Sequence, residues 1–280
     1  MQSTRLFRLP RSALCRCNSS GPKWGESQAR RAAQCGLSTS RTGNSETRAS
    51  KVPLRIMPLG GSITYGVGSP DGNGYRKTLY DILVARGYTT EMVGSRRSGS
   101  MVNNHNEGWR GCRIDQIHEK AKAAARLLPN LFTVNAGSND CLQGFQIPSA
   151  GARLDALIEE LWTLAPGATV ILSTLLVTSN KQANATIFRV NEQIRDLVER
   201  KSAQQKSILL AEMYSCVGAP QLRDLVEDGV HPNADGYAKM AIIWADSIDK
   251  AARSGILRRP GISADERSDD ANSPGAHAER

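Results

Sequence analysis

Between residues 51 and 253, short apolar runs alternate with longer segments in which apolar residues recur at helical spacing. This alternation predicts parallel strands joined by helices, because a parallel strand pair needs a crossover connection, which is usually a helix. We expect strands at residues 54–58, 89–93, 131–134, 168–173 and 207–211. We expect helices at residues 75–86, 114–128, 154–164, 183–201 and 234–251. The predicted class is α/β, with helices on both faces of a five-stranded parallel sheet.

The two ends of the chain differ from this central unit in composition. Residues 1–50 carry nine Lys and Arg against two acidic residues, which gives +7 of the total net charge of +9. The basic charge therefore belongs to a tail and not to a binding face, and we expect no nucleic-acid partner. We predict a disordered basic extension at 1–50, one folded domain at 51–253 and a disordered tail at 254–280.

The first twenty residues bear on localisation. They hold four arginines and several serines but no acidic residue, a composition typical of a transit peptide, and they lack the unbroken apolar core of a secretory signal. A plain disordered extension is an equal alternative. No apolar run reaches the roughly 20 residues that cross a bilayer, so we expect no transmembrane segment.

Six cysteines are divided equally between the basic tail and the rest of the chain. No Cys-x-x-Cys pair occurs, which weakens zinc-binding and thioredoxin-like interpretations. Outside the tail, Cys112 and Cys141 each follow a suspected functional motif, and Cys216 lies further along the chain. A bridge between Cys112 and Cys141 is one interpretation, and free buried thiols are the one that we favour.

Four glycine-rich or polar motifs lie where a parallel sheet gathers its functional residues, which is beyond the carboxyl ends of the strands. Residues 60–66 follow the first predicted strand, 107–111 the second and 136–140 the third, and residues 228–233 precede the last helix. If the predicted sheet forms, these motifs lie at one edge of it.

Three residues of these motifs are candidates for nucleophilic catalysis. Ser62 lies in a glycine-flanked turn, where the backbone can bend sharply and expose the hydroxyl. His231 can accept the hydroxyl proton, because the ordinary pKa of histidine lies near neutrality. Asp228 precedes it by three residues, close enough to hold the other ring nitrogen. Gly111 and Asn139 can add a backbone and a side-chain donor for an oxyanion.

Each motif also has a plain structural interpretation. A serine between glycines is usually only a turn, and residues 228–233 read equally well as a loop that ends in a helix cap at Asn233. The occurrence of all four motifs, in this order and at these loop positions, favours the catalytic interpretation.

At this point the sequence resembles the SGNH (GDSL-like) hydrolase superfamily, over about residues 52–250. Residues 60–64 resemble its first block, Gly111 its second, Asn139 its third, and Asp228 with His231 its Asp-x-x-His block. The resemblance implies a flavodoxin-like three-layer fold. Gly61 departs from the pattern, which usually has Asp before the serine. Gly108 is a rival for the glycine of the second block, and we prefer Gly111 because it directly precedes a predicted helix.

Within the superfamily, the spread of motifs is most similar to acetylxylan-esterase-like proteins of carbohydrate esterase family 3. The residues that carry this similarity are 55–60, 74–76, 93–95 and 107–108. The similarity implies deacetylation of a polysaccharide such as acetylated xylan, with a small-molecule or polysaccharide ester as substrate. It also implies secretion, in conflict with the first residues. Lysophospholipases and thioesterases of the same superfamily remain alternatives.

The implied reaction passes through an acyl-enzyme on Ser62 and requires no metal ion and no organic cofactor. The backbone of Ser62, Gly111 and the Asn139 amide would hold the oxyanion. Trp109 and Arg110 flank the suspected oxyanion glycine and are candidate substrate contacts. The alternative, which we slightly favour, is that Trp109 packs its loop and that Arg110 is solvated.

Two other classes of protein are weaker alternatives. A nucleotide-binding protein with this fold would need a P-loop or a complete Gly-x-Gly-x-x-Gly fingerprint, and neither occurs in the sequence. A carbohydrate-binding module that has lost its activity is compatible with the fold, but the joint presence of Ser62, Asn139, Asp228 and His231 argues against it.

Overall fold

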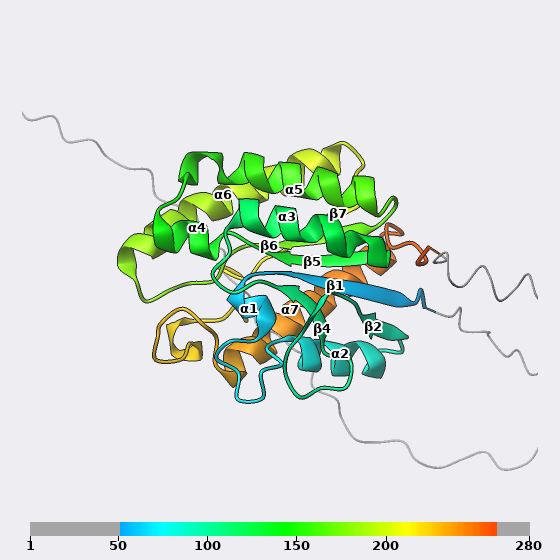
Figure 1. Ribbon diagram of the computed structural model, residues 1–280, viewed down its shortest axis with the longest axis horizontal. Helices are drawn as coiled ribbons and strands as arrows, with labels where there is room; N and C mark the ends of the chain where they lie inside the picture. Colours follow the sequence, from blue (N-terminus) through cyan, green and yellow to red (C-terminus); the bar gives the residue numbers. More distant parts are fainter. Residues whose placement is uncertain (1–50, 262–280) are drawn as a thin grey trace, which may run out of the picture. The chain divides into compact units, whose positions relative to one another are not determined.

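The computed structural model describes residues 51–261 of the chain (Figure 1). The predictions for residues 1–50, including the leader and three of the cysteines, lie outside the described residues, as do those for 262–280. The strands are β1 (Leu54–Gly60), β2 (Thr90–Met92), β3 (Arg96–Arg97), β4 (His105–Gly108), β5 (Leu131–Asn135), β6 (Thr169–Ser173) and β7 (Ile208–Ala211). The α-helices are α1 (Ser62–Tyr65), α2 (Arg76–Ala85), α3 (Ile114–Ala124), α4 (Ser138–Gln143), α5 (Ala150–Leu164), α6 (Lys181–Ala203) and α7 (Ala234–Arg253).

The core of the sheet is the predicted set of five parallel strands, in the order β2-β1-β5-β6-β7. Every residue of β5 and β6 is buried, as expected for central strands covered on both faces. The doubly wound α/β fold class predicted from the sequence is therefore confirmed.

Two short strands add an edge that the sequence did not predict. β4 pairs in parallel with the last residues of β1, and β3 pairs antiparallel with β4. Their sequences, Arg-Arg and His-Asn-Glu-Gly, have no apolar alternation, so nothing in them indicated a strand. The loop between β2 and α3 is thereby fixed beside the end of β1.

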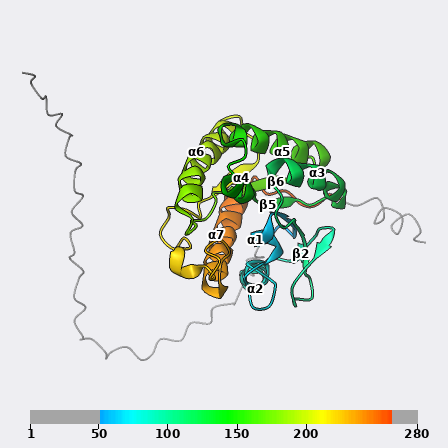
Figure 2. The same cartoon turned by 60° about the vertical axis from the view of Figure 1, so that its left-hand side comes forward.

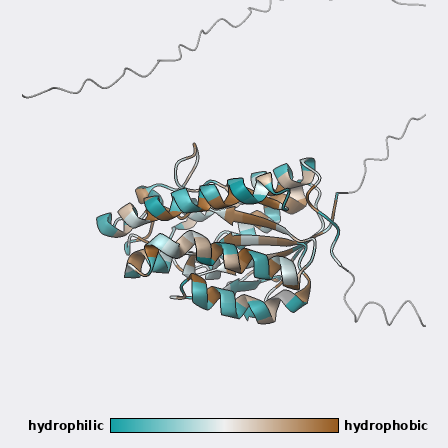
Figure 3. Cartoon of the chain, turned by 90° about the horizontal axis from the view of Figure 1, so that it is seen from above, coloured by the Kyte–Doolittle hydropathy of each residue, from teal (hydrophilic) through white to brown (hydrophobic). Residues whose placement is uncertain are grey.

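Helices cover both faces of the sheet and bury two separate apolar clusters. α3, α5 and α6 pack on one face, and α2 and α7 pack together on the other (Figures 1 and 2). Apolar residues lie on the strands and on the inner sides of the helices, whereas the outer sides are hydrophilic (Figure 3). Among the helices of residues 51–261, none has the length and apolar character needed to cross a bilayer.

Two helix bounds differ from prediction by four residues, the end of α3 and the start of α5. Helix α5 begins at Ala150, four residues before the predicted start, and includes Gly151. Gly151 is a poor helix former in isolation. Its N–H donates to Gln193 Oε1 at 2.8 Å, and a Cβ at this position would lie 3.0 Å from Gln193 Cβ. Packing against α6 therefore extends the helix to a residue at which propensity alone predicts none.

The last residue of β1 is Gly60, and its lack of a side chain lets the neighbouring strand β5 approach closely. Gly60 pairs with Asn135 of β5, and a Cβ on Gly60 would lie 2.2 Å from the Asn135 carbonyl oxygen. The adjacent Gly61 has more room, since its Cβ would meet the Asn139 Nδ2 atom at 3.4 Å.

We therefore expect Gly60→Ala to lower the free energy of unfolding by about 1–3 kcal/mol, the usual cost of overpacking. Gly61→Ala is the matched control and should cost less than about 1 kcal/mol. Urea unfolding of both variants measures the difference. Equal losses of stability in the two variants would contradict the steric role of Gly60.

Candidate active site

Ser62 is presented by a sharp turn between β1 and α1. β1 ends at Gly60, Gly61 is the N-cap residue, and Ser62 is the first residue of the short helix α1. Gly66 then ends α1 in a left-handed conformation, with φ of +101°. The hydroxyl of Ser62 is thereby placed at the carboxyl edge of the sheet, where the sequence predicted it.

The loop before α7 brings His231 and Asp228 to this hydroxyl. The distance from His231 Nε2 to Ser62 Oγ is 2.7 Å, across a separation of 169 residues. His231 Nδ1 lies 2.6 Å from Asp228 Oδ2. Ser62, His231 and Asp228 thus form one continuous chain of hydrogen bonds.

Backbone hydrogen bonds from its own loop hold the Asp228 carboxylate in place. Its Oδ1 atom accepts hydrogen bonds from the backbone N–H groups of Val230 and His231, at 2.8 and 2.9 Å. Partial burial alone would raise the pKa of Asp228, but these hydrogen bonds and the one from the His231 ring outweigh it and lower the pKa below its usual value. Because an ionised carboxylate only accepts hydrogen bonds, His231 Nδ1 carries the proton and Nε2 is free to accept one from Ser62.

The same loop is also the cap of a helix, as the structural interpretation of residues 228–233 predicted. The Asn233 side chain accepts a hydrogen bond from the Gly236 N–H at 3.0 Å and starts α7. The cap fixes the point from which the His231 loop leaves the helix.

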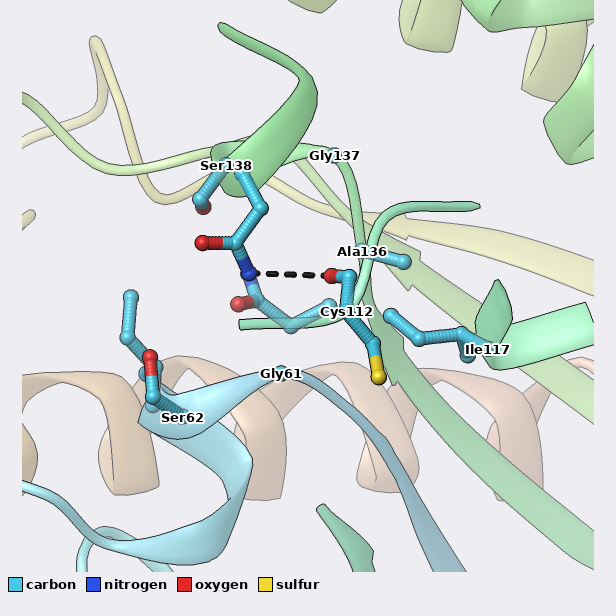
Figure 4. Close-up of a pocket in the computed structure, with 10 residues that line it drawn as sticks. Gly61, Ser62, Cys112, Ile117, Ala136, Gly137 and Ser138 are labelled. Carbon is cyan, nitrogen blue, oxygen red and sulfur yellow. Dashed lines mark hydrogen bonds between the residues drawn. The ribbon is translucent and has the colours of Figure 1, made fainter. Parts of the chain in front are cut away.

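Asn139 is the second residue of α4, and it lines the same pocket as Ser62, which Figure 4 shows together with Cys112 and Ser138. Its Nδ2 atom donates to the Cys112 carbonyl oxygen at 2.9 Å, which orients the amide. An amide NH₂ has two hydrogens, so a second one is available for a ligand. Gly61 has no side chain to help hold this amide, and Cys112 supplies the hydrogen bond instead.

Asp140, the next residue along α4, anchors this corner of the site and was not singled out from the sequence. It is fully buried, and it accepts hydrogen bonds from the Ile114 N–H and from the Arg153 guanidinium. Burial raises the pKa of Asp140 although Arg153 opposes the shift. The Asp140 carboxylate therefore ties α4 to the start of α3. The signal in the sequence that could have identified Asp140 is its position directly after Asn139.

Arg76 holds the end of α1 in place. In the sequence it was one of the residues that carry the similarity to carbohydrate esterase family 3, and no site role was predicted for it. This fully buried guanidinium donates to the carbonyl oxygens of Thr64 and Tyr65, at 3.1 and 3.2 Å. It also donates to the Ser98 carbonyl and hydroxyl, at 3.0 and 2.8 Å. Burial lowers the pKa of Arg76. The cation thus binds the end of the helix that begins with Ser62.

The two candidate glycines of the second block occupy different environments. Gly108 is buried, and its N–H donates to Asn106 Oδ1 at 2.9 Å, so this N–H is not available to a ligand. Gly111 is exposed, has a left-handed φ of +75° and precedes Cys112, which lines the pocket. Of the two, Gly111 is the one whose N–H can still meet a ligand.

The pocket beside Ser62 is small. Its volume is about 10 Å³, about the room that one water molecule needs. Its lining is Gly61, Ser62, Ile63, Cys112, Ile117, Asn135, Ala136, Gly137, Ser138 and Asn139. A second pocket of similar volume shares Ile63 and Ser138 and is otherwise mainly apolar, with Leu142, Leu176, Val177, Thr178, Ile187 and Val230.

Trp109 and Arg110 lie on the surface beside the pocket. The indole N–H of Trp109 donates to Glu107 Oε2 at 2.9 Å, and the Arg110 side chain is exposed. The cysteines of residues 51–261 are all free, including Cys112 and Cys141. Burial raises the pKa of Cys141 to about 12.

A three-layer α/β fold of this strand order, with a serine and a histidine joined at the carboxyl edge of the sheet, defines the class of SGNH hydrolases. A model of the GDSL-like Lipase/Acylhydrolase family matches residues 59–239. The chain belongs to this family, as the sequence resemblance predicted.

Individual relatives agree with this assignment. A "Multidomain esterase" of Ruminococcus flavefaciens is 30% identical over 227 residues, which cover 70% of this chain and 28% of the relative. The chain therefore spans little more than a quarter of that relative. The structure of a family 3 carbohydrate esterase of Clostridium thermocellum is 27% identical, has a TM-score of 0.65, and is matched over 73% of this chain and 99% of its own.

A fungal structure has the same fold. The carbohydrate esterase family 3 protein of Talaromyces cellulolyticus has a TM-score of 0.62 at 21% identity, over 72% of this chain and 99% of its own. Residues 59–239 therefore form an esterase/acylhydrolase domain whose structural neighbours include carbohydrate esterases of family 3.

The lowered pKa of Asp228 has a consequence for stability. A carboxyl group whose folded pKa lies below its unfolded value of about 3.9 stabilises the fold above that pH, and loses this contribution as the pH falls through the folded pKa. We expect Asp228→Asn to be less stable than wild type at pH 6, and the difference to shrink between about pH 4 and pH 2. Urea unfolding across this range measures it.

Asp196→Asn, at an exposed carboxylate on α6, is the control for a general loss of negative charge. A stability difference for Asp228→Asn that persists undiminished at the acid end would show that its carboxylate charge does not contribute.

Proposed function

We propose that this domain is a serine esterase in which Ser62 is the nucleophile, His231 its general base and Asp228 the group that orients and stabilises the imidazole. The observation that carries the proposal is the hydrogen-bonded chain from Ser62 Oγ through the His231 ring to the Asp228 carboxylate. A hydroxyl is a weak nucleophile unless an adjacent base removes its proton. In the proposed arrangement His231 is that base and Asp228 is the partner of the base.

The proposed reaction has two halves. Ser62 Oγ attacks the ester carbonyl carbon while His231 Nε2 takes the hydroxyl proton. The tetrahedral intermediate then collapses, the C–O bond to the alcohol breaks, and the imidazolium returns its proton to the leaving alkoxide. Water, deprotonated by the same nitrogen, attacks the acyl carbon. The bond from that carbon to Ser62 Oγ then breaks, the imidazolium returns its proton to Oγ, and the acid leaves.

Three donors are proposed for the oxyanion. The Ser62 N–H belongs to the first residue of α1 and therefore has no acceptor within that helix. The Gly111 N–H lies in the exposed turn beside Cys112, and the Asn139 amide retains one hydrogen after its bond to the Cys112 carbonyl oxygen. Donors fixed in advance of the reaction stabilise the developing negative charge without reorganisation.

The proposed substrates are short acyl esters, above all acetyl esters of carbohydrate such as acetylated xylan. The small volume beside Ser62 favours an acetyl group, and the resemblance to family 3 carbohydrate esterases favours a sugar alcohol. The apolar second pocket favours the alternative of a longer acyl chain, as in a lysophospholipase or thioesterase.

Replacement of the nucleophile tests the reaction. We expect Ser62→Ala to lower kcat on 4-nitrophenyl acetate by about 10⁴-fold or more, because the remaining groups have no hydroxyl to activate. Ser202→Ala, at an exposed serine on α6, is the control and should retain wild-type activity. A wild-type protein as inert as Ser62→Ala would contradict the proposal and favour the inactive carbohydrate-binding module.

Acyl-chain length tests the substrate class. Each methylene group that a pocket cannot accept changes kcat/KM by about tenfold or more, so we expect a steep fall from acetyl through butanoyl to octanoyl 4-nitrophenyl esters. Release of acetate from acetylated xylan should accompany it. A preference for octanoyl would contradict the acetyl assignment and favour the lysophospholipase or thioesterase alternative.

A further inference from the structure

We infer that a cationic surface beside the Ser62 pocket binds an acidic sugar, so that the preferred alcohol is a carbohydrate containing uronic acid residues. This surface, the cationic rim, consists of Tyr65, Arg96, Trp109, Arg110 and Lys120. The inference rests on the proposed function and goes beyond it by naming the charge of the substrate.

Cations and aromatic rings are packed together in the rim. The Arg96 guanidinium lies over the Trp109 ring, 4.4 Å from its centroid, and 5.6 Å from the centroid of Tyr65. Lys120 Nζ lies 4.9 Å from the Trp109 centroid, and the Arg110 guanidinium lies 5.9 Å from that of Tyr65. Aromatic faces hold cations in place without neutralising their charge.

The three cations have no acidic partner within residues 51–261. Some basic side chains of this part of the chain form ion pairs, among them Arg113 and Lys122, whereas Arg96, Arg110 and Lys120 form none there. The carboxylate of Glu107 lies beneath Trp109, but it is fully buried and accepts from the Trp109 indole and the Ser95 N–H. The rim therefore holds three cations that form no ion pair with an acidic side chain of residues 51–261, and Arg110 and Lys120 are exposed to solvent.

The rim is built on the same elements as the active site. Tyr65 ends the helix that begins with Ser62. The Trp109 N–H donates to the Gly60 carbonyl oxygen at 2.8 Å, and the Trp109 carbonyl oxygen would lie 3.9 Å from a Cβ on Gly61. The turn from Trp109 then reaches Cys112, which lines the Ser62 pocket. A substrate whose ester lies at Ser62 therefore extends over the rim when its alcohol leaves on this side.

The two sides of the site differ in polarity, one being apolar and the other cationic. The second pocket, toward α4 and α6, is lined mainly by aliphatic side chains and suits the uncharged acyl side. The rim, toward β3 and β4, suits a carboxylate, because guanidinium groups pair with carboxylates in a fixed fork geometry. A uronic acid supplies a carboxylate on a polyhydroxylated ring and so joins this charge to the carbohydrate substrate of the proposed function.

The test compares acetylated oligogalacturonide with neutral acetylated xylo-oligosaccharide. We expect wild type to prefer the acidic substrate, and added NaCl to weaken that preference, because salt screens exposed charges. Arg96→Gln/Arg110→Gln/Lys120→Gln should lose about tenfold in kcat/KM on the acidic substrate, mainly through KM, at the usual strength of exposed ion pairs. Its activity on the neutral substrate and on 4-nitrophenyl acetate should stay within about twofold of wild type.

Lys250→Gln/Arg253→Gln/Arg259→Gln is the matched control with the same change in charge. Lys250 lies sixteen residues along α7 from its first residue, about 24 Å from the His231 end of the helix. We expect this control to keep the wild-type preference.

Three outcomes would overturn the inference. One is equal use of both substrates by wild type, and another is an equal loss of activity on both substrates in the rim variant. The third is competitive inhibition by an RNA oligonucleotide but not by unacetylated oligogalacturonide, which would assign the rim to nucleic acid. Loss of wild-type activity on 4-nitrophenyl acetate as well would instead contradict the serine esterase itself.

Discussion

The register of β1 between its two neighbours is the constraint on which the site depends. Gly60 pairs with Asn135 of β5 on one side and with Gly108 of β4 on the other. Ser62, Asn139 and Gly111 follow these three paired residues by two, four and three positions. Backbone pairing at the end of one strand therefore sets the spacing of the candidate nucleophile and both candidate oxyanion loops. A register shift of β1 would displace Ser62 relative to Asn139 and Gly111, because a different strand carries each of the three loops.

Buried charged groups support this edge of the sheet from within. The Arg76 guanidinium joins the end of α1 to the loop around Ser98, and the Asp140 carboxylate joins α4 to the start of α3. Both groups are fully buried and bonded to backbone atoms. Desolvation of a charge is costly unless hydrogen bonds replace the lost water, so each group tolerates little change in the position of its partners. The loops that carry Ser62 and Asn139 are held by these internal bonds.

His231 and Asp228 differ in their exposure to solvent. The His231 side chain is 17% exposed and that of Asp228 is 47% exposed. Asp228 nevertheless has a lowered pKa, because its hydrogen bonds come from backbone groups of its own loop. A short loop of six residues thus carries the proposed base, its proposed orienting carboxylate and the cap of α7. Because these residues lie in one short loop, the same motif supports both a structural and a chemical interpretation.

Much of the outline could be predicted from the sequence, because it depends on short-range patterns. Apolar periodicity located the five core strands and the long helices. The strand-end motifs gave Ser62 and Asn139 as candidates, and the loop before the last helix gave Asp228 and His231. β3 and β4 were missed because their stability comes from pairing, of β4 with β1 and of β3 with β4, and not from their own residues. The early start of α5 was missed for a similar reason, since contact with Gln193 determines it.

The sequence by itself determined the fold class, the family and the set of residues proposed for the chemistry. Only the tertiary structure decided which of their atoms meet. It brought His231 Nε2 to 2.7 Å from Ser62 Oγ and gathered Arg96, Trp109 and Lys120 on one surface. The physical reason is that local periodicity fixes elements, whereas contacts between residues far apart in the chain depend on strand register and helix packing, which no single segment encodes.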